Sequence, residues 1–198
     1  MLNEYQFVTS WRVRGAPAEV YRIISRPLDY PRWWPAVYLD ALELDAGDDS
    51  GLNARVRFHT KGWLPYTLRW DSHTVMVAEP KVLAIRASGD LDGRGIWHFE
   101  GDGEFTNVYF DWKVRADKLL LRVMSPALRP AFAANHRWAM KQGEISLERE
   151  LARRHARTPE ERALVPPPPP PAKSSGLALT AAGLAVFAGA LAFRKSKR

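Results

Sequence analysis

The sequence contains no cysteine, and this absence excludes several kinds of chemistry. A chain without thiols forms no disulfide, has no thiolate nucleophile and offers no sulfur ligand to zinc. The five histidines are scattered, without the spacing of a metal site. There is no Gly-rich phosphate loop and no Gly-x-Ser-x-Gly motif, and residues 89–93 are too short and too poor in oxygens for a calcium loop. We therefore expect no metal and no cofactor.

Acidic residues are absent after Val165, whereas basic residues continue to the end. The chain has 29 lysines and arginines and 22 aspartates and glutamates, a formal charge of +7. The five bases beyond Val165 are Lys173, Arg194, Lys195, Lys197 and Arg198. Without them 24 bases, 29 less these five, remain against 22 acids. A nucleic-acid surface needs a concentrated basic face, so this near-neutral remainder predicts no nucleic-acid partner.

Most of the chain from residue 5 to residue 115 alternates between apolar and polar residues, which is the period of half-buried strands. Strands are predicted at residues 5–13, 37–44, 52–61, 66–78, 82–88, 95–100 and 105–115. Two short helices, each opening with a proline, are predicted after the first strand, at residues 17–25 and 27–34. The later connections are short, so the strands must run antiparallel.

A long helix is predicted at residues 125–156. Ser125 can cap it, and Pro130 either kinks it or delays its start. Apolar spacings of three and four make one stripe, which consists of Phe132, His136, Ala139, Met140, Gly143, Leu147 and Leu151. This stripe needs a partner layer. The sequence therefore predicts an α+β fold in which a curved antiparallel sheet wraps around a long C-terminal helix and leaves a hollow between them.

Five stretches carry a family likeness: residues 11–13 (WRV), 16–21 (APAEVY), 29–35 (DYPRWWP), 95–100 (GIWHFE) and 108–112 (VYFDW). In this order they resemble the START/Bet v 1-like helix-grip (SRPBCC) superfamily, and within it the polyketide cyclase/dehydrase and lipid-transport group. The likeness covers about residues 3–155. It implies a hydrophobic cavity between the sheet and the long helix. It implies no particular reaction, because members range from carriers to cyclases.

In such a fold the inward-facing residues would line the cavity. The predicted ligand pocket is made of Phe58, Trp70, Ile85, Trp97, Phe99, Phe110 and Trp112 from the sheet, and Phe132, Asn135, His136 and Met140 from the helix. The alternative is that these residues fill a solid core. The eight tryptophans favour a cavity, since wide indole rings line hollows and their N–H groups need polar partners.

His136 is the titratable residue that we expect on the buried stripe. It is either a polar anchor or general acid/base that faces a ligand, or a hydrogen-bonded core histidine. No catalytic residue is assigned. Two other polar groups are expected on the solvated outer face of the sheet: Arg69, Asp71 and His73, and Arg55, Arg57 and His59.

The sequence changes character beyond the long helix. Residues 158–165 are polar and charged, and residues 166–171 are six prolines, which predict a stiff spacer of about 19 Å. Residues 176–193 form an uncharged run rich in alanine and leucine, and a helix of about 27 Å would just span a bilayer core. We predict a single-pass transmembrane helix there, followed by the basic tail 194–198. The alternative is a buried core helix or a disordered tail.

The direction of this span is ambiguous. Residues 1–8 lack the basic start and the apolar run of a secretory signal, so the folded part is expected in the cytoplasm. The positive-inside rule would instead retain the basic tail there. Ala181, Ala185 and Gly189, four residues apart, predict weak self-association of the span.

The chain thus divides into a START-like ligand-binding domain (1–157), a charged and Pro-rich linker (158–175), a transmembrane helix (176–193) and a basic tail (194–198). The leading hypothesis is a membrane-tethered carrier or sensor of a hydrophobic small molecule, such as a lipid, polyketide or isoprenoid. One alternative is a cyclase or dehydratase, in which His136 would pair with a buried Asp or Arg. The other is a protein-binding scaffold with a filled core.

Overall fold

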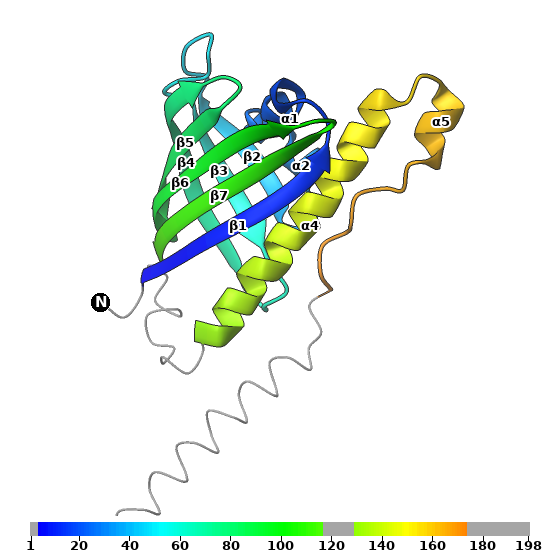
Figure 1. The fold of residues 1–198 in the computed structure, drawn as a ribbon. Helices are drawn as coiled ribbons and strands as arrows, with labels where there is room; N and C mark the ends of the chain where they lie inside the picture. The colour runs from blue at the N-terminus through cyan, green and yellow to red at the C-terminus, as the bar shows by residue number, and fades with distance from the viewer. Residues whose placement is uncertain (1–3, 117–128, 174–198) are drawn as a thin grey trace, which may run out of the picture.

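The computed structural model describes residues 4–116 and 129–173 (Figure 1). The strands are β1 (Glu4–Arg14), β2 (Tyr38–Asp45), β3 (Arg55–Lys61), β4 (Thr67–Ala78), β5 (Val82–Gly89), β6 (Leu91–Asp102) and β7 (Phe105–Ala116). They form one antiparallel seven-stranded sheet in the order β1-β7-β6-β5-β4-β3-β2. The sheet curves around the long helix α4 (Arg129–His155), which packs against β1 (Figure 1). The predicted α+β fold is confirmed.

Two strand boundaries differ from the prediction because glycine and asparagine have particular backbone roles. Strand β6 begins at Leu91 instead of residue 95, since Gly93 is a point of close approach and not a turn: a Cβ atom there would lie 2.1 Å from the carbonyl oxygen of Lys113. Strand β3 begins at Arg55 instead of residue 52, because Asn53 adopts a left-handed conformation with φ of 68° within the preceding turn.

Short helices follow β1, as predicted. They are α1 (Pro17–Ile24), the 3-10 turn η1 (Pro27–Asp29) and α2 (Tyr30–Trp33). The tryptophans of the Trp33-Trp34 pair are both buried. On α4, Met140, Leu147 and Leu151 of the predicted stripe are buried against the sheet. The predicted cap, Ser125, lies outside the described residues.

A buried ion network joins α4 to the α2 region. The carboxylate of Glu150 is almost fully buried and accepts two hydrogen bonds of 2.9 Å from Arg32 and a third of 2.9 Å from Arg154. Burial alone would raise the pKa of Glu150, but the hydrogen bonds and charges of the two arginines outweigh it, so this pKa lies below its ordinary value. The network fixes the C-terminal half of α4 on the domain.

Strand β2 forms one edge of the sheet, and its pairing with β3 is irregular. The register shifts between Tyr38 and Asp40 and again between Glu43 and Asp45. Such bulges bend and twist a strand. Its side chains are mostly exposed, Leu42 by 56%.

The segment after α4 contains a short helix that was not predicted, because residues 158–165 were interpreted only as polar and charged. Helix α5 (Pro159–Leu164) is capped by Thr158, whose hydroxyl accepts a hydrogen bond of 3.2 Å from the Glu161 N–H. The sequence Thr-Pro-Glu-Glu carries the signal for this cap, with proline at the first helical position and glutamate three residues after the cap.

The prolines do not lead away from the domain as a free spacer. Residues 166–172, here called the proline strap, turn back along α4 (Figure 1). Arg153 donates to the carbonyl oxygen of Pro166, Arg149 to that of Pro167, and the Lys61 ammonium to that of Ala172 at 2.7 Å. Prolines have no N–H, so their carbonyl oxygens are the polar groups through which such a segment can dock.

None of the helices in residues 4–116 and 129–173 combines the length and the apolar character that a membrane span requires. The predicted span at residues 176–193 and the basic tail lie outside those ranges.

Candidate ligand-binding cavity

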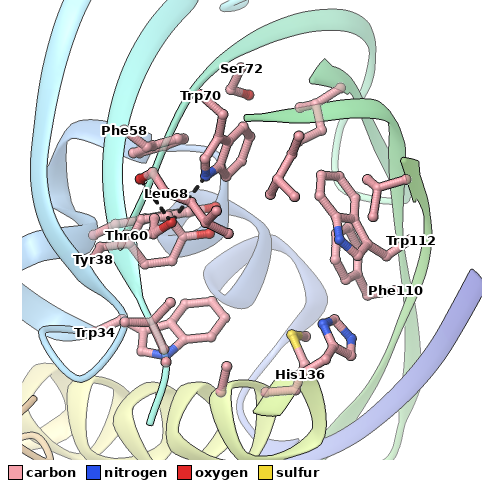
Figure 2. Close-up of a pocket in the computed structure, with 18 of the residues that line it drawn as sticks. Trp34, Tyr38, Phe58, Thr60, Leu68, Trp70, Ser72, Phe110, Trp112 and His136 are labelled. Atoms are coloured by element: carbon pink, nitrogen blue, oxygen red, sulfur yellow. Dashed lines mark hydrogen bonds between the residues drawn. The ribbon is translucent and has the colours of Figure 1, made fainter. Parts of the chain in front are cut away.

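A cavity of about 190 Å³ lies between the concave face of the sheet and α4 (Figure 2). An apolar cavity of roughly 150 Å³ is large enough to hold benzene. Residues from β1, the short helices, six further strands and α4 line it. The expectation of a hollow, and not a solid core, is therefore met in the described part of the chain.

Stacked rings form one wall. Trp97 and Phe110 stack with centroids 3.9 Å apart, and Phe110 and Trp112 stack at 5.4 Å. Gly95 makes room for them, because a Cβ atom there would lie 2.7 Å from the Phe110 ring and 2.8 Å from that of Trp112. Alternation along β6 and β7 places these rings on the inner face, and the glycine permits their contact.

The facing wall combines rings with satisfied polar groups. Phe58 and Trp70 are 5.0 Å apart, and Phe58 and Tyr38 are 4.9 Å apart. The Trp70 indole N–H donates to the Thr60 hydroxyl at 3.2 Å, and that hydroxyl donates to the carbonyl oxygen of Leu68 at 3.4 Å (Figure 2). Burial raises the pKa of Tyr38 above its ordinary value, so its hydroxyl is neutral at physiological pH.

His136 extends from α4 toward Phe110 and Trp112 (Figure 2). Its ring stacks on Phe7 with centroids 4.1 Å apart. Its Nε2 atom is buried and has no hydrogen-bond partner among the described residues, which departs from the expected hydrogen-bonded core histidine. Burial, with a smaller contribution from the charge of Arg137, lowers the pKa of His136 to about 4. The imidazole is therefore neutral at pH 7.

Five partly exposed lining residues, Tyr5, Lys61, Tyr66, Phe132 and Asn135, lie together at one end of the cavity, here called the mouth. This end lies where β1 and β4 begin, β3 ends and α4 starts.

Asn135 holds the β3–β4 turn at the mouth. Its Oδ1 atom accepts hydrogen bonds from the backbone N–H groups of Trp63 at 2.9 Å and Leu64 at 3.2 Å. A Cβ atom at Gly62 would lie 2.1 Å from this oxygen, so the close approach depends on glycine.

Of the eleven predicted pocket residues, the structure places ten on the cavity wall: Phe58, Trp70, Ile85, Trp97, Phe110, Trp112, Phe132, Asn135, His136 and Met140. Phe99 is not on it. Its ring is buried against Tyr21 of α1, with centroids 5.3 Å apart, because α1 covers the inner face of β6 at that point. Contact of the ten residues with a ligand stays a prediction.

Sequence reasoning missed several lining residues, among them Tyr5, Phe7, Trp34, Tyr38, Thr60, Tyr66 and Leu68. A signal existed for Phe7, which alternates with polar neighbours in the first strand. No comparable pattern marks Trp34, since it precedes a proline after a single helical turn and reaches the cavity only through the packing of α2.

The buried Asp or Arg required by the cyclase hypothesis is not on the wall. Among the described lining residues the charged one is Lys61, which binds the proline strap. Asp71 faces away and forms an ion pair of 2.8 Å with Arg57 on the outer side of the sheet. The hydrogen bond from Arg57 holds the pKa of Asp71 below its ordinary value. Among the described residues no cluster of metal-ligating side chains occurs.

Comparison with known proteins gives the wider context. The family model for polyketide cyclase/dehydrase and lipid transport matches residues 5–151. No match was found among curated proteins. The Zhui aromatase/cyclase from Streptomyces sp. R1128 is similar in structure, with a TM-score of 0.64 and 16% identity over 78% of this chain and 97% of that one.

Two further solved structures are similar. TTHA0849 from Thermus thermophilus has a TM-score of 0.63 and 16% identity over 77% of this chain and 100% of that one. A START superfamily protein from Mycobacterium smegmatis has a TM-score of 0.60 and 15% identity over 73% of this chain and 98% of that one. At these identities the likeness shows the shared fold alone.

Proposed function

Because the chain belongs to the polyketide cyclase/dehydrase and lipid-transport family, within the START/Bet v 1-like (SRPBCC) superfamily, we propose that it is a carrier or sensor of a hydrophobic small molecule. The cavity supports this proposal. Its wall is built mainly from aromatic and aliphatic side chains, as in most ligand pockets. Its volume of about 190 Å³ suits a single ring system or a chain segment. A lipid, polyketide or isoprenoid has such a part.

Apart from Lys61, which binds the proline strap, the polar groups of the wall point to a neutral ligand headgroup. Thr60 and Trp70 satisfy each other, Tyr38 carries a neutral hydroxyl, and His136 is uncharged at pH 7. A buried polar atom without a partner costs about 1–3 kcal/mol, so a ligand hydroxyl or carbonyl that paired with His136 would recover part of this energy. A carboxylate would find no cationic imidazole there.

The same features favour binding over catalysis. A general acid or base works best with a pKa near the operating pH, and the pKa of His136 is about 4. Its Nε2 atom has no partner within the described residues that could orient it or relay a proton. A cyclase or dehydratase therefore remains the alternative that these observations do not favour.

The membrane tether is the second part of the proposal. Its support is the uncharged run at residues 176–193, followed by the basic tail. Such a tether would hold the cavity close to the phase in which hydrophobic ligands dissolve. The cytoplasmic placement of the domain, stated above as an expectation, is part of this proposal.

Cavity filling tests the binding proposal. Ala139 lines the cavity, whereas Ala152 lies on the exposed face of the same helix. The full chain, Ala139→Trp and Ala152→Trp would be purified from membranes under the same conditions, and the co-purified small molecules compared by mass spectrometry. We expect one apolar species with the full chain and with Ala152→Trp, and its loss from Ala139→Trp. Identical profiles for all three proteins would contradict ligand binding in the cavity.

A further inference from the structure

The proline strap ends at the cavity mouth. Lys61 belongs to the cavity wall, and its ammonium group binds the carbonyl oxygen of Ala172 at 2.7 Å. The other end of the strap is held on α4 through Arg149 and Arg153. The strap thus starts near the C-terminal end of α4 and brings the chain back to the end of the domain that carries the mouth.

The sequence leaves little slack beyond this point. Only residues 174 and 175 separate Lys173 from the uncharged run that begins at Gly176. At about 3.3–3.6 Å per residue, the three steps from residue 173 to residue 176 reach roughly 10 Å at most. If residues 176–193 cross the bilayer, Ala172 and the Lys61 side chain that binds it must lie near the membrane surface.

We propose that the proline strap orients the domain with its cavity mouth against the bilayer, so that the cavity exchanges its ligand directly with the membrane. This inference rests on the proposed tether and narrows the ligand to a molecule that resides in the bilayer. A free linker of the same length would let the domain rotate and present any face. The docked strap removes that freedom, because three side chains bind its carbonyl oxygens at both ends.

The composition of the mouth agrees with this orientation. Trp63, in the turn beside the mouth, is 39% exposed, and the turn also contains Leu64 and Pro65. Tryptophan is enriched at the membrane–water interface, where its ring lies at the level of the headgroups. Lys61 adds a positive charge at the same end.

Single labels can measure the orientation, because the natural chain has no cysteine to interfere. A fluorophore would be attached to Pro65→Cys beside the mouth, or to Asp49→Cys in the β2–β3 loop at the opposite end of the sheet. The ends are separated by the length of β3, because β4 runs from Thr67 at the mouth to Thr74 beside this loop, and seven steps of about 3.3 Å span roughly 23 Å. The full chain would be reconstituted in phosphatidylcholine–phosphatidylglycerol vesicles that contain a nitroxide-headgroup lipid as quencher.

We expect the lipid to quench the Pro65→Cys label strongly and the Asp49→Cys label weakly. Adding Arg149→Ala and Arg153→Ala should abolish this difference. The matched control is Arg22→Ala with Arg137→Ala, which removes the same charge from two exposed arginines that make no hydrogen bond to the strap in the described structure, and it should keep the difference. Equal quenching of both labels in the natural background, or an unchanged difference without Arg149 and Arg153, would overturn the proposal.

A second variant keeps the proposal testable if the protein with both Arg149→Ala and Arg153→Ala does not fold. Replacing residues 166–171 with Gly-Ser repeats of the same length keeps the reach but removes the stiff proline backbone, and it too should equalise the two labels. The failures separate cleanly. Oriented protein without any co-purified ligand would contradict the binding proposal alone, whereas protein that does not associate with the vesicles would contradict the tether and this orientation together.

Discussion

Trp34 lies directly on Gly143, and no side chain fits between them. A Cβ atom at Gly143 would come within 2.3 Å of Cζ2 of the indole. The same indole lines the cavity. This contact therefore sets how closely α4 approaches the segment after α2, and with it the width of the cavity at that point.

The sign of the change in the free energy of unfolding on Gly143→Ala tests this contact. In a helix interior the higher helix propensity of alanine alone should raise the free energy of unfolding by about 1 kcal/mol. Overpacking against Trp34 should cost about 1–3 kcal/mol, so we expect Gly143→Ala to lower the free energy of unfolding. Urea denaturation of this variant would be compared with that of Gln142→Ala, its neighbour on the helix. A more stable Gly143→Ala protein would show that Trp34 can move to accommodate the added methyl group, and would contradict the prediction.

The depressed pKa of His136 predicts a pH dependence of stability. Between about pH 6.5 and pH 4 the unfolded chain binds a proton at His136 that the folded protein does not. Its contribution is complete above about pH 6.5 and is lost as the pH falls toward 4, by up to about 3 kcal/mol. His136→Phe, which can still stack on Phe7, should lack this loss.

Denaturation midpoints from pH 7 to pH 4 check the prediction, with substitution of the exposed His98 by glutamine as the control. Direct titration of the imidazole by NMR gives a second measurement. An NMR pKa near 6.5 for His136 would be inconsistent with its burial in the cavity wall.

Glu150 predicts a second, more acidic dependence. Its pKa is lowered in the folded protein, so its contribution is present above about pH 4.5 and is lost as the pH falls below that value. Glu150→Gln removes the charge that Arg32 and Arg154 share, and should cost about 2–3 kcal/mol at pH 7, less than a fully enclosed pair because Arg32 is half exposed. Thermal or urea unfolding beside Glu148→Gln, an exposed position on the same helix, measures it. Equal stability of the two variants would argue that the network contributes nothing.

Asn135 predicts a local effect at the mouth. Asn135→Ala removes the acceptor for two backbone N–H groups and should cost about 2 kcal/mol. Asn135→Asp keeps oxygen acceptors and should lose much less. Amide hydrogen exchange at Trp63 and Leu64 is the measurement, and it should accelerate in the alanine variant only. Unchanged exchange in both variants would show that other contacts hold this turn.

The tether is tested in membranes. We expect the full chain to resist extraction by alkaline carbonate and a chain ending at residue 173 to be released. Two lysines in the run, Leu184→Lys with Phe187→Lys, should also release it, since each charge at the centre of a span costs about 2.5–3.5 kcal/mol, whereas Leu184→Ile should not.

The orientation of the tether is tested by protease accessibility. Protease added to the cytoplasmic side should degrade the domain. Cleavage only from the other side would reverse the orientation.

Regular patterns made the layers of this fold predictable. The period-two alternation from residue 105 to residue 115 locates β7, and the spacing of Met140, Leu147 and Leu151 identifies the buried face of α4. Most of the cavity wall follows, because residues that face inward from a curved sheet converge on the helix that it surrounds. The sequence therefore predicted the cavity wall where its residues alternate along a strand.

The errors arose where tertiary contacts decide. Phe99 has the same alternation as Trp97, and only the position of α1 distinguishes them. Gly93 resembles a turn residue in sequence but serves the close approach of two strands. The return of the proline strap depends on Arg149 and Arg153 facing it from α4, which composition alone does not reveal.

The irregular edge strand β2 has a consequence for assembly. An open strand with regular pairing groups is a template for another copy, and proteins protect such edges with bulges and charges. The shifts after Tyr38 and Glu43, together with the acidic Asp40 and Asp45, break the row of N–H and C=O groups that a neighbour would need. Neighbouring copies of the chain would therefore not polymerise by adding strands at the β2 edge, although Leu42 leaves this edge partly apolar.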